Sequence, residues 1–303
     1  MRAMTQSQPS PVRGVFWMLV TGLCFVTVTA LVKYLDNAVP AAQAAFLRYL
    51  LGLVFLLPIA KSLLATRLSL RQWTLFGVRG AVHTLGVILW FFAMTRIPIA
   101  EVTAMNYLSP VYVTIGAALF LGEKLATRRI MAVCVALVGA AIILRPGFRE
   151  VNAGHMAMLG TAVLFAVSYL VAKIMADETP ASVVVAMLSV TVTIGLAPFA
   201  FAVWVAPDLW TLAVCFAIAS VATGGHFAMT LAFSAAPLTV TQPVTFLQLV
   251  WAVALGALVF GEPVDIVVVV GGALILASVV FITLREAQLK RRGVTPAVNA
   301  PKT

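Results

Sequence analysis

The sequence predicts an all-α membrane protein in which ten transmembrane helices form two inverted five-helix repeats. Three observations lead to this fold class. The composition is too apolar for a soluble protein, ten apolar stretches of membrane-spanning length follow one another, and the second half of the chain repeats the first.

The composition excludes a soluble globular protein. Of the 303 residues, 62% are hydrophobic and 10% are charged, whereas soluble domains are about 45–50% apolar and about 25% charged. The net charge of +10 does not indicate nucleic-acid binding, because the basic residues lie in short segments between apolar stretches. We therefore expect a lipid bilayer around the chain and no nucleic-acid partner.

Helices that span a bilayer need about 20 mostly apolar residues, and charges, prolines and glycine-rich turns divide this chain into ten such segments. In order, the predicted spans are 14–34, 41–60, 73–95, 98–121, 128–145, 154–175, 181–205, 209–233, 237–260 and 263–284. The connections are a few residues long, apart from a basic linker around Lys61 to Gln72, so we expect no soluble domain.

Local signals flank the predicted spans of the first half. Arg13 precedes the first span, which is long enough to cross the bilayer and is therefore expected to be retained rather than cleaved as a signal peptide. Pro40 precedes the second span, and the basic linker precedes the third. Pro98 begins the fourth span, and basic residues at 124–129 and Arg145 flank the fifth.

Similar signals recur in the second half. Lys173 lies at the end of the sixth span, and Pro180 precedes the seventh. Pro237 begins the ninth span, the turn at 261–263 separates it from the tenth, and Arg285 follows the tenth.

The loop charges predict that both termini are cytoplasmic. With this orientation, 14 of the 20 lysines and arginines lie on the cytoplasmic side and 4 on the other side, while Arg48 and Arg79 fall within spans. Cytoplasmic loops carry such an excess of basic residues. We therefore expect a multi-pass protein of a bacterial inner membrane.

The two halves are related by an offset of 139 to 140 residues. Identical pairs at these offsets include Gly14/Gly154, Thr21/Thr161, Phe25/Phe165, Lys33/Lys173, Pro40/Pro180, Gly86/Gly225, Gly122/Gly261 and Glu123/Glu262. Gly86 and the Gly224-Gly225 pair lie near mid-span, where glycine either permits close helix packing or provides a bending point.

Each repeat holds five spans, so the second repeat must enter the membrane from the opposite face. Such an inverted pair has a pseudo-two-fold axis in the membrane plane, and exchange of conformations between the halves opens a central site to one side and then to the other. A passive bundle that arose by gene duplication is the alternative.

The ends of the fourth and ninth spans carry a resemblance to a known family. The stretches are Tyr107-Leu108-Ser109-Pro110 through Leu121-Gly122-Glu123, and Phe246-Leu247-Gln248-Leu249-Val250-Trp251 through Phe260-Gly261-Glu262-Pro263. With ten spans in two repeats, they resemble EamA-type carriers of the drug/metabolite transporter superfamily. The second stretch is most similar to the subgroup that includes riboflavin and S-adenosylmethionine carriers.

The resemblance covers residues 14 to 284 and implies one five-helix repeat at 14–145, a second at 154–284, and cytoplasmic tails at 1–13 and 285–303. It also implies a central cavity lined by spans 1, 3, 4, 6, 8 and 9. Many family members have a proline in the second repeat where this chain has Leu249, the counterpart of Pro110. Because the proline here is Pro243, we expect any hinge in the ninth span about two turns nearer its start.

Arg48 lies near the middle of the second span, where a charged side chain is expensive and needs a partner. Glu101 lies one turn into the fourth span. We expect Arg48 either to pair with Glu101, as a structural ion pair, or to present its guanidinium to an anionic group of a substrate.

Other ionisable residues in the spans have alternative roles. Arg79 and His83 share a helix face. Arg79 either snorkels to the interface or faces the cavity. His83 is the candidate for proton coupling; the alternative is a structural histidine that is buried and bonded to its neighbours. Lys33 and Lys173 are gate charges or interface anchors. Glu123 and Glu262 are expected to be structural elements at helix ends.

Aromatic and amide side chains predict an apolar substrate site with a few polar contacts. The candidates that line it are Trp90, Asn106, Tyr107, Ser109, Ser168, Tyr169, Gln242, Gln248 and Trp251, with Arg48, His83 and Glu101. Packing against neighbouring helices is the alternative for each aromatic residue.

These features predict a secondary active carrier of a small organic metabolite, such as a vitamin or a nucleoside-like cofactor; an exporter of amino acids, metallophores or drugs is the alternative. An enzyme is not expected, because the sequence holds no HExxH or GxSxG string. A scaffold or receptor subunit is a further rival. We expect no cofactor and no metal site, since the cysteines and histidines are scattered, and we leave proton coupling and a homodimer open.

Overall fold

The computed structural model describes residues 11–35, 38–59, 66–120, 127–148, 150–176, 178–179, 181–236 and 242–294. Its elements are helices. In chain order they are α1 (Pro11–Leu35), α2 (Ala41–Gly52), the 3-10 helix η1 (Leu53–Ile59), α4 (Leu70–Met94), α5 (Ile99–Asn106), α6 (Leu108–Phe120), α7 (Thr127–Leu144), α8 (Ala153–Ala176), α9 (Ala181–Ala202), α10 (Leu209–Ala235), the 3-10 helix η2 (Gln242–Thr245), α12 (Phe246–Phe260) and α13 (Ile266–Val294).

Every predicted span has a helical counterpart, which confirms the all-α membrane fold class. Seven helices in the described part of the chain are long and apolar enough to cross a membrane. The remaining three spans correspond to α5 with α6, to α7, and to η2 with α12.

Most element boundaries differ from the predicted ones by a few residues, and the end of α13 differs most. α13 continues to Val294 rather than ending at 284, because the polar residues that follow the apolar part include strong helix formers such as Glu286 and Lys290. The second span changes to a 3-10 helix at Leu53 and ends at Ile59. Pro58 lies in that last turn, where it has no N–H to donate to a regular helix.

The fourth and ninth spans are broken, and they meet at their breaks. α5 ends at Asn106, the residue whose carbonyl would accept a hydrogen bond from position 110 in a continuous helix, but Pro110 has no N–H. In the ninth span, η2 changes to α12 between Thr245 and Phe246. The Tyr107 hydroxyl donates to the Thr245 carbonyl at 2.9 Å and so joins the two breaks.

These two breaks lie at equivalent positions of the repeats, since Asn106 and Thr245 are 139 residues apart. The hinge predicted about two turns nearer the start of the ninth span falls at residues 237–241, which lie outside the described part of the chain. Pro243 is the second residue of η2, in a first turn where the missing N–H costs little.

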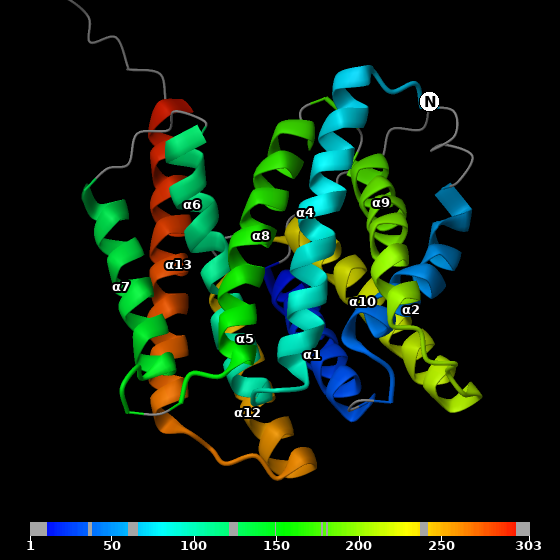
Figure 1. Cartoon of the computed structure of the whole chain (residues 1–303). Coiled ribbons are helices and arrows are strands. Elements are labelled where there is room, and N and C mark those ends of the chain that lie inside the picture. Colours follow the sequence, from blue (N-terminus) through cyan, green and yellow to red (C-terminus); the bar gives the residue numbers. More distant parts are fainter. Residues whose placement is uncertain are drawn as a thin grey trace, which may run out of the picture.

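The helices pack in a two-fold pattern (Figure 1). α1 of the first repeat packs along α10 of the second, and α8 of the second packs along α4 of the first. α2 likewise contacts α10, and α9 contacts α4. α7 and α13, the last helices of the repeats, pack against each other at one edge of the bundle. The core therefore lies between the repeats rather than within each one.

One polar contact is made twice across this arrangement. The Thr21 hydroxyl of α1 lies 3.4 Å from the Gly225 carbonyl of α10, and the Thr161 hydroxyl of α8 lies 3.3 Å from the Gly86 carbonyl of α4. Both threonines and both glycines are identical pairs of the internal repeat. The sequence identities thus correspond to equivalent contacts between the halves.

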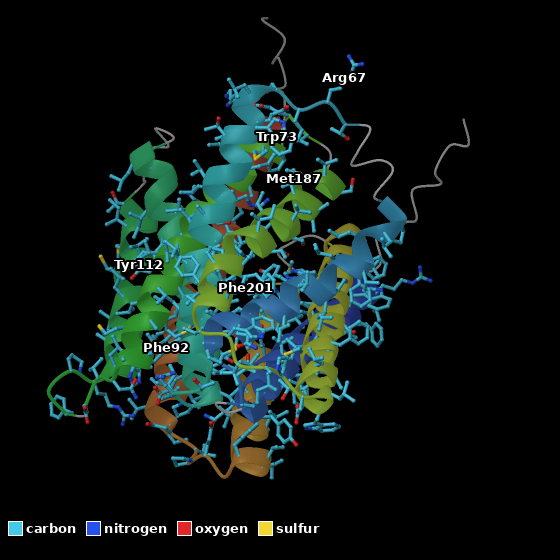
Figure 2. All side chains as sticks on the ribbon, turned by 45° about the vertical axis from the view of Figure 1, so that its right-hand side comes forward. Arg67, Trp73, Phe92, Tyr112, Met187 and Phe201 are labelled. Carbon is cyan, nitrogen blue, oxygen red and sulfur yellow. The ribbon has the colours of Figure 1, made fainter. Side chains whose placement is uncertain are left out.

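Polar residues cap the first turns of α4 and α10. Ser69 and Gln72 form a reciprocal capping box at the start of α4, and Arg67, just before it, extends away from the bundle (Figure 2). Asp208 caps α10 by accepting from the Thr211 N–H at 2.7 Å. Hydrogen bonds from the Thr211 side chain and backbone lower the pKa of Asp208.

Candidate functional site

The two repeats enclose a cavity of about 290 Å³. Residues of α1, α4, α5, α6, α8, α10, η2 and α12 line it, as the resemblance implies for their spans. α2 also contributes, through Arg48 and Tyr49, and α13 contributes Leu276 and Val279. The cavity lies at the level of the two helix breaks, because Asn106, Tyr107 and Thr245 are in its lining.

Aromatic rings form two sides of this cavity. On the α4–α8 side, the His83 ring stacks on Phe165 with centroids 4.6 Å apart, and Trp90 meets Phe165 edge-on at 6.0 Å. On the α1–α10 side, Phe25 meets His226 edge-on at 5.0 Å. Such surfaces suit a planar, conjugated molecule.

Arg48 is the charged side chain among the described residues that line the cavity. It is 8% exposed, and its guanidinium carbon lies 4.1 Å from the centre of the Tyr49 ring. Within the described chain it makes no hydrogen bond or ion pair, and no aspartate or glutamate lies in this lining. Its five N–H donors are therefore available to a ligand.

Three further polar atoms of the cavity lining have no hydrogen-bond partner in the described part of the chain. They are Trp90 Nε1, Asn106 Oδ1 and Ser109 Oγ. A buried polar atom without a partner carries a desolvation cost that a ligand or water relieves. The lining residues thus hold a donor, an acceptor and a hydroxyl whose hydrogen bonds are not made within the described chain.

His83 is held by its neighbours. Its Nδ1 lies 3.0 Å from the Ser168 hydroxyl, and its Nε2 lies 3.3 Å from the Tyr49 hydroxyl. Both ring nitrogens therefore have polar partners, one on α8 and one on α2. Arg79, one turn earlier on α4, is buried and donates to the Val184 carbonyl of α9 at 2.9 Å, so it does not snorkel to the interface.

The structure brings most of the predicted site residues together. Those that line the cavity are Arg48, His83, Trp90, Asn106, Tyr107, Ser109, Tyr169 and Gln248. Ser168 lies behind the lining, bonded to His83. Trp251 is outside it and 38% exposed, and the side chain of Gln242 is outside the described part of the structure.

Of the two alternatives for Arg48, the ion pair with Glu101 is not formed. Glu101 lies in the first turn of α5, beyond the cavity, and its Oε2 is 2.6 Å from Nε2 of His155 on α8. Both side chains of this pair are 4% exposed. Val102 and Thr103 of the same helix line the cavity with Arg48, so Glu101 points away from it on another face of α5.

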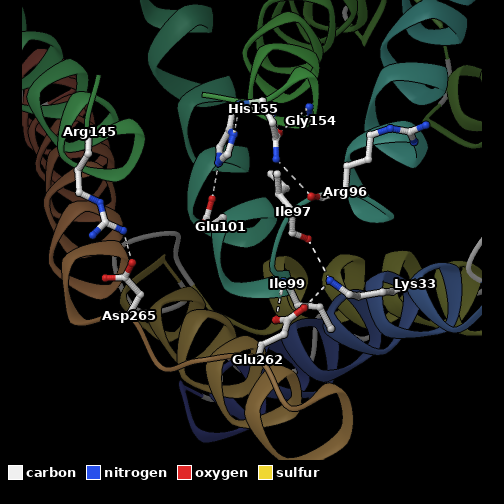
Figure 3. A network of polar contacts seen from close by, with 11 residues as sticks. Lys33, Arg96, Ile97, Ile99, Glu101, Arg145, Gly154, His155, Glu262 and Asp265 are labelled. Carbon is white, nitrogen blue, oxygen red and sulfur yellow. Dashed lines mark hydrogen bonds and ion pairs between the residues drawn. The ribbon is translucent and has the colours of Figure 1, made fainter. Parts of the chain in front are cut away.

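A polar network closes the end of the bundle at which α1 ends and α5 begins (Figure 3). Glu262 pairs with Lys33 of α1 and accepts a hydrogen bond from the Ile99 N–H, the first of α5, at 2.9 Å. Lys33 also donates to the Ile97 carbonyl at 3.2 Å. A carboxylate at a helix N-terminus is favourable, so Glu262 fastens α12, α1 and α5 together.

A left-handed residue lets Glu262 reach this position. Gly261, with φ of +64°, ends α12, and glycine adopts that conformation without a steric penalty. Lys173 and Glu123, the counterparts of Lys33 and Glu262 in the other repeats, have side chains outside the described part of the structure.

A second cavity of about 260 Å³ lies at this end, lined by Glu101, Glu150, His155, Glu262 and Asp265 among others. Arg145, in the connection between α7 and α8, pairs with Asp265, which directly precedes α13. Partial burial alone would raise the pKa of Asp265, but hydrogen bonds from Arg145 and from the Val267 N–H lower it below its usual value. Turns of α5, α12 and α13 separate this cavity from the central one.

Sequence reasoning missed Phe25, Phe165 and His226 as cavity residues. Phenylalanines in an apolar span have no feature that distinguishes a lining position from a packed one. The identity of Phe25 and Phe165 across the repeat could have indicated these two residues. A residue that is identical in both halves lies either near the pseudo-two-fold axis or in a contact that both halves make.

Proteins of known function resemble this chain over most of its length. It is 32% identical to a riboflavin transporter of Vibrio cholerae, covering 93% of this chain and 96% of the relative. It is 24% identical to an S-adenosylmethionine uptake transporter of Rickettsia prowazekii, covering 90% and 93%. It is 26% identical to the pseudopaline exporter CntI of Pseudomonas aeruginosa, covering 89% and 95%.

A solved crystal structure shares the fold, with a TM-score of 0.58 and 19% identity over 94% of this chain and 100% of that one. The model of the EamA-like transporter family matches residues 12–145 and again residues 152–284. Together the two matches take in all of the described helices up to α13. The protein therefore belongs to the EamA-like transporter family.

Proposed function

We propose that this protein is a secondary active carrier that moves a small organic metabolite across a bacterial inner membrane by alternating access, with riboflavin as the first candidate substrate. The central cavity between the inverted repeats is the proposed substrate site. We further propose that both termini are cytoplasmic, as the distribution of basic residues supports.

The observation that carries the choice of substrate is the cavity lining. It combines aromatic rings, neutral polar groups and the Arg48 guanidinium, with no carboxylate among its described residues. Riboflavin, the substrate in the names of the 32% identical relatives, offers a flat conjugated ring with carbonyl acceptors. Those acceptors match the donors of Arg48 and Trp90.

S-adenosylmethionine, named for the less similar relatives, is a weaker match. Arg48 can bind its carboxylate, but the described lining holds no aspartate or glutamate for its positive sulfonium and ammonium groups. An exporter of amino acids, metallophores or drugs is the alternative, and Arg48 favours it if the compound carries a carboxylate.

Counterflow tests the proposal. Purified protein in liposomes preloaded with unlabelled riboflavin should accumulate external labelled riboflavin transiently, without an ion gradient and for an importer or an exporter alike. Preloading with S-adenosylmethionine or amino acids should not support this accumulation. No accumulation of riboflavin, or faster exchange of one of the other compounds, would contradict the proposed substrate.

A further inference from the structure

Two phenylalanines occupy equivalent places on opposite walls of the central cavity. Phe25 of α1 and Phe165 of α8 are one of the identical pairs of the repeat, and both line the cavity. Since α1 packs along α10 and α8 packs along α4, each ring is held by a helix of the other half.

A glycine of the partner helix lies beside each ring, and at Gly86 a larger residue would clash with the ring. A Cβ added at Gly86 of α4 would lie 2.8 Å from two ring carbons of Phe165, and one added at Gly225 of α10 would lie 3.7 Å from two ring carbons of Phe25. The same helices supply His83 and His226, whose rings contact Phe165 and Phe25. The phenylalanine, the glycine and a histidine thus recur on both walls.

The polar edge of the cavity comes from the first repeat alone. Arg48 lies on α2, Trp90 on α4, Asn106 on α5 and Ser109 on α6, and the last three each carry a buried polar atom with no partner in the described chain. The two phenylalanine walls are therefore alike in composition, although His83 stacks on Phe165 and His226 meets Phe25 edge-on, whereas the hydrogen-bonding edge comes from one repeat. A ligand that fits has two equivalent apolar faces and one polar edge.

We propose that Phe25 and Phe165 are the two platforms between which the substrate lies, and that this site selects a flat conjugated ring whose carbonyl edge is bound by Arg48 and Trp90. The inference rests on the proposed function for its use in transport, but it concerns the ring and not the rest of the substrate. Because one ring belongs to each repeat, binding of the substrate also depends on how the two halves are placed relative to each other.

Fluorescence titration in detergent tests this inference with two probes, riboflavin and lumiflavin, which is the same ring without the ribityl chain. Both should bind the unaltered protein. Phe25→Leu and Phe165→Leu should each weaken binding of both probes about tenfold or more, as expected for loss of a stacking platform. Phe165→Tyr, which keeps the ring, should restore most of the affinity.

Phe216→Leu is the matched control, because Phe216 of α10 is 45% exposed and stacks on Phe55 away from the cavity; its affinity should be unchanged. A monodisperse elution profile establishes that each variant is folded. Gly86→Ala, which keeps both phenylalanines but displaces the Phe165 ring, should resemble Phe165→Leu.

The outcomes separate this inference from the proposed function. Counterflow of riboflavin with unchanged probe affinity in both leucine variants would overturn the platforms and leave the carrier in place. Lumiflavin binding that depends on both phenylalanines, without riboflavin counterflow, would support the platforms and reject riboflavin as the substrate. Absence of binding by both probes to the unaltered protein would overturn the inference.

Discussion

Arg48 is a buried arginine of the central cavity. The Tyr49 ring packs against its guanidinium, and no acidic residue lies among the described residues of the cavity lining. The Tyr49 ring stabilises the guanidinium by a cation–π contact without using its in-plane N–H donors. A planar fork of donors left open in a site of low polarity is well suited to bind carbonyl or carboxylate oxygens of a substrate.

Replacement of Arg48 should therefore impair transport more than stability. Arg48→Gln is expected to lower kcat/KM for counterflow about tenfold to a hundredfold, the effect of a lost charged hydrogen bond. Arg48→Lys should recover only part of it, because an ammonium lacks the planar fork. Counterflow rates over a range of substrate concentrations give these values, and Arg48→Gln with unchanged kinetics would exclude Arg48 from the substrate site.

His83 tests the alternative of proton coupling at the residue scale. Because its two ring nitrogens are bonded to the Ser168 and Tyr49 hydroxyls and its ring stacks on Phe165, we expect it to position these groups. His83→Gln should then raise KM severalfold and leave the shape of the pH profile of transport unchanged. A profile that becomes flat between pH 5 and pH 8 would instead make His83 the proton site.

At the scale of elements, glycine decides how closely the helices of the two halves approach. The α1–α10 contact depends on Gly225, where an added Cβ would lie 2.9 Å from the Cys24 Cβ, whereas one added at Gly224 would meet nothing within 4 Å. The mid-span glycine pair thus combines one packing position with one open position.

This pair provides a matched test. Gly225→Ala should destabilise the protein by about 1–3 kcal/mol, because extra volume in a packed contact forces the helices apart. Gly224→Ala should be neutral or stabilising by up to about 1 kcal/mol, since alanine is the better helix former. Thermal unfolding in detergent gives the order of the midpoints. Equal effects of the two substitutions would show that helix packing at Gly225 is not close.

Charged side chains of other elements contact the first turn of the short helix α5 and hold it in place. Glu262→Gln should weaken that attachment, because Lys33 loses its counter-ion and the Ile99 N–H loses a charged acceptor; the expected loss is about 1–3 kcal/mol of stability. Glu150→Gln is the control, since Glu150 lines the same cavity but is exposed. Identical unfolding midpoints for the two variants would remove the structural role of Glu262.

The overall fold of the molecule was the property best predicted from the sequence. Apolar stretches and the 139–140 offset predicted the helical membrane fold and its repeats, since bilayer thickness fixes helix length and duplication leaves identities at a constant spacing. The cavity residues Asn106, Tyr107 and Gln248 could be anticipated because amides and hydroxyls are costly in contact with lipid.

Arrangements between helices were less accessible. Spacing along one span does not reveal which span faces it. The pair of Glu101 with Arg48 was therefore one of two alternatives, the pair of Glu101 with His155 was not foreseen, and Phe25 and Phe165 were overlooked. The equivalence of the two helix breaks was also missed, because proline position alone does not determine where a helix changes direction.

The central claim is that the cavity between the repeats opens to one face of the membrane at a time. The most direct test uses Thr103→Cys in a chain whose three cysteines are replaced, since Thr103 is 4% exposed and lines the cavity. A membrane-impermeant maleimide is applied to vesicles of each orientation. Trp251→Cys, outside the cavity on α12, is the control, and its modification should not depend on substrate.

Position 103 should be modified from both faces, and saturating riboflavin should protect it from both. Adding Glu262→Gln should speed modification from the face at which Glu262 lies and slow it from the other, because opening of one end accompanies closure of the other. Modification from a single face under all conditions, or faster modification from one face with no change at the other, would contradict alternating access.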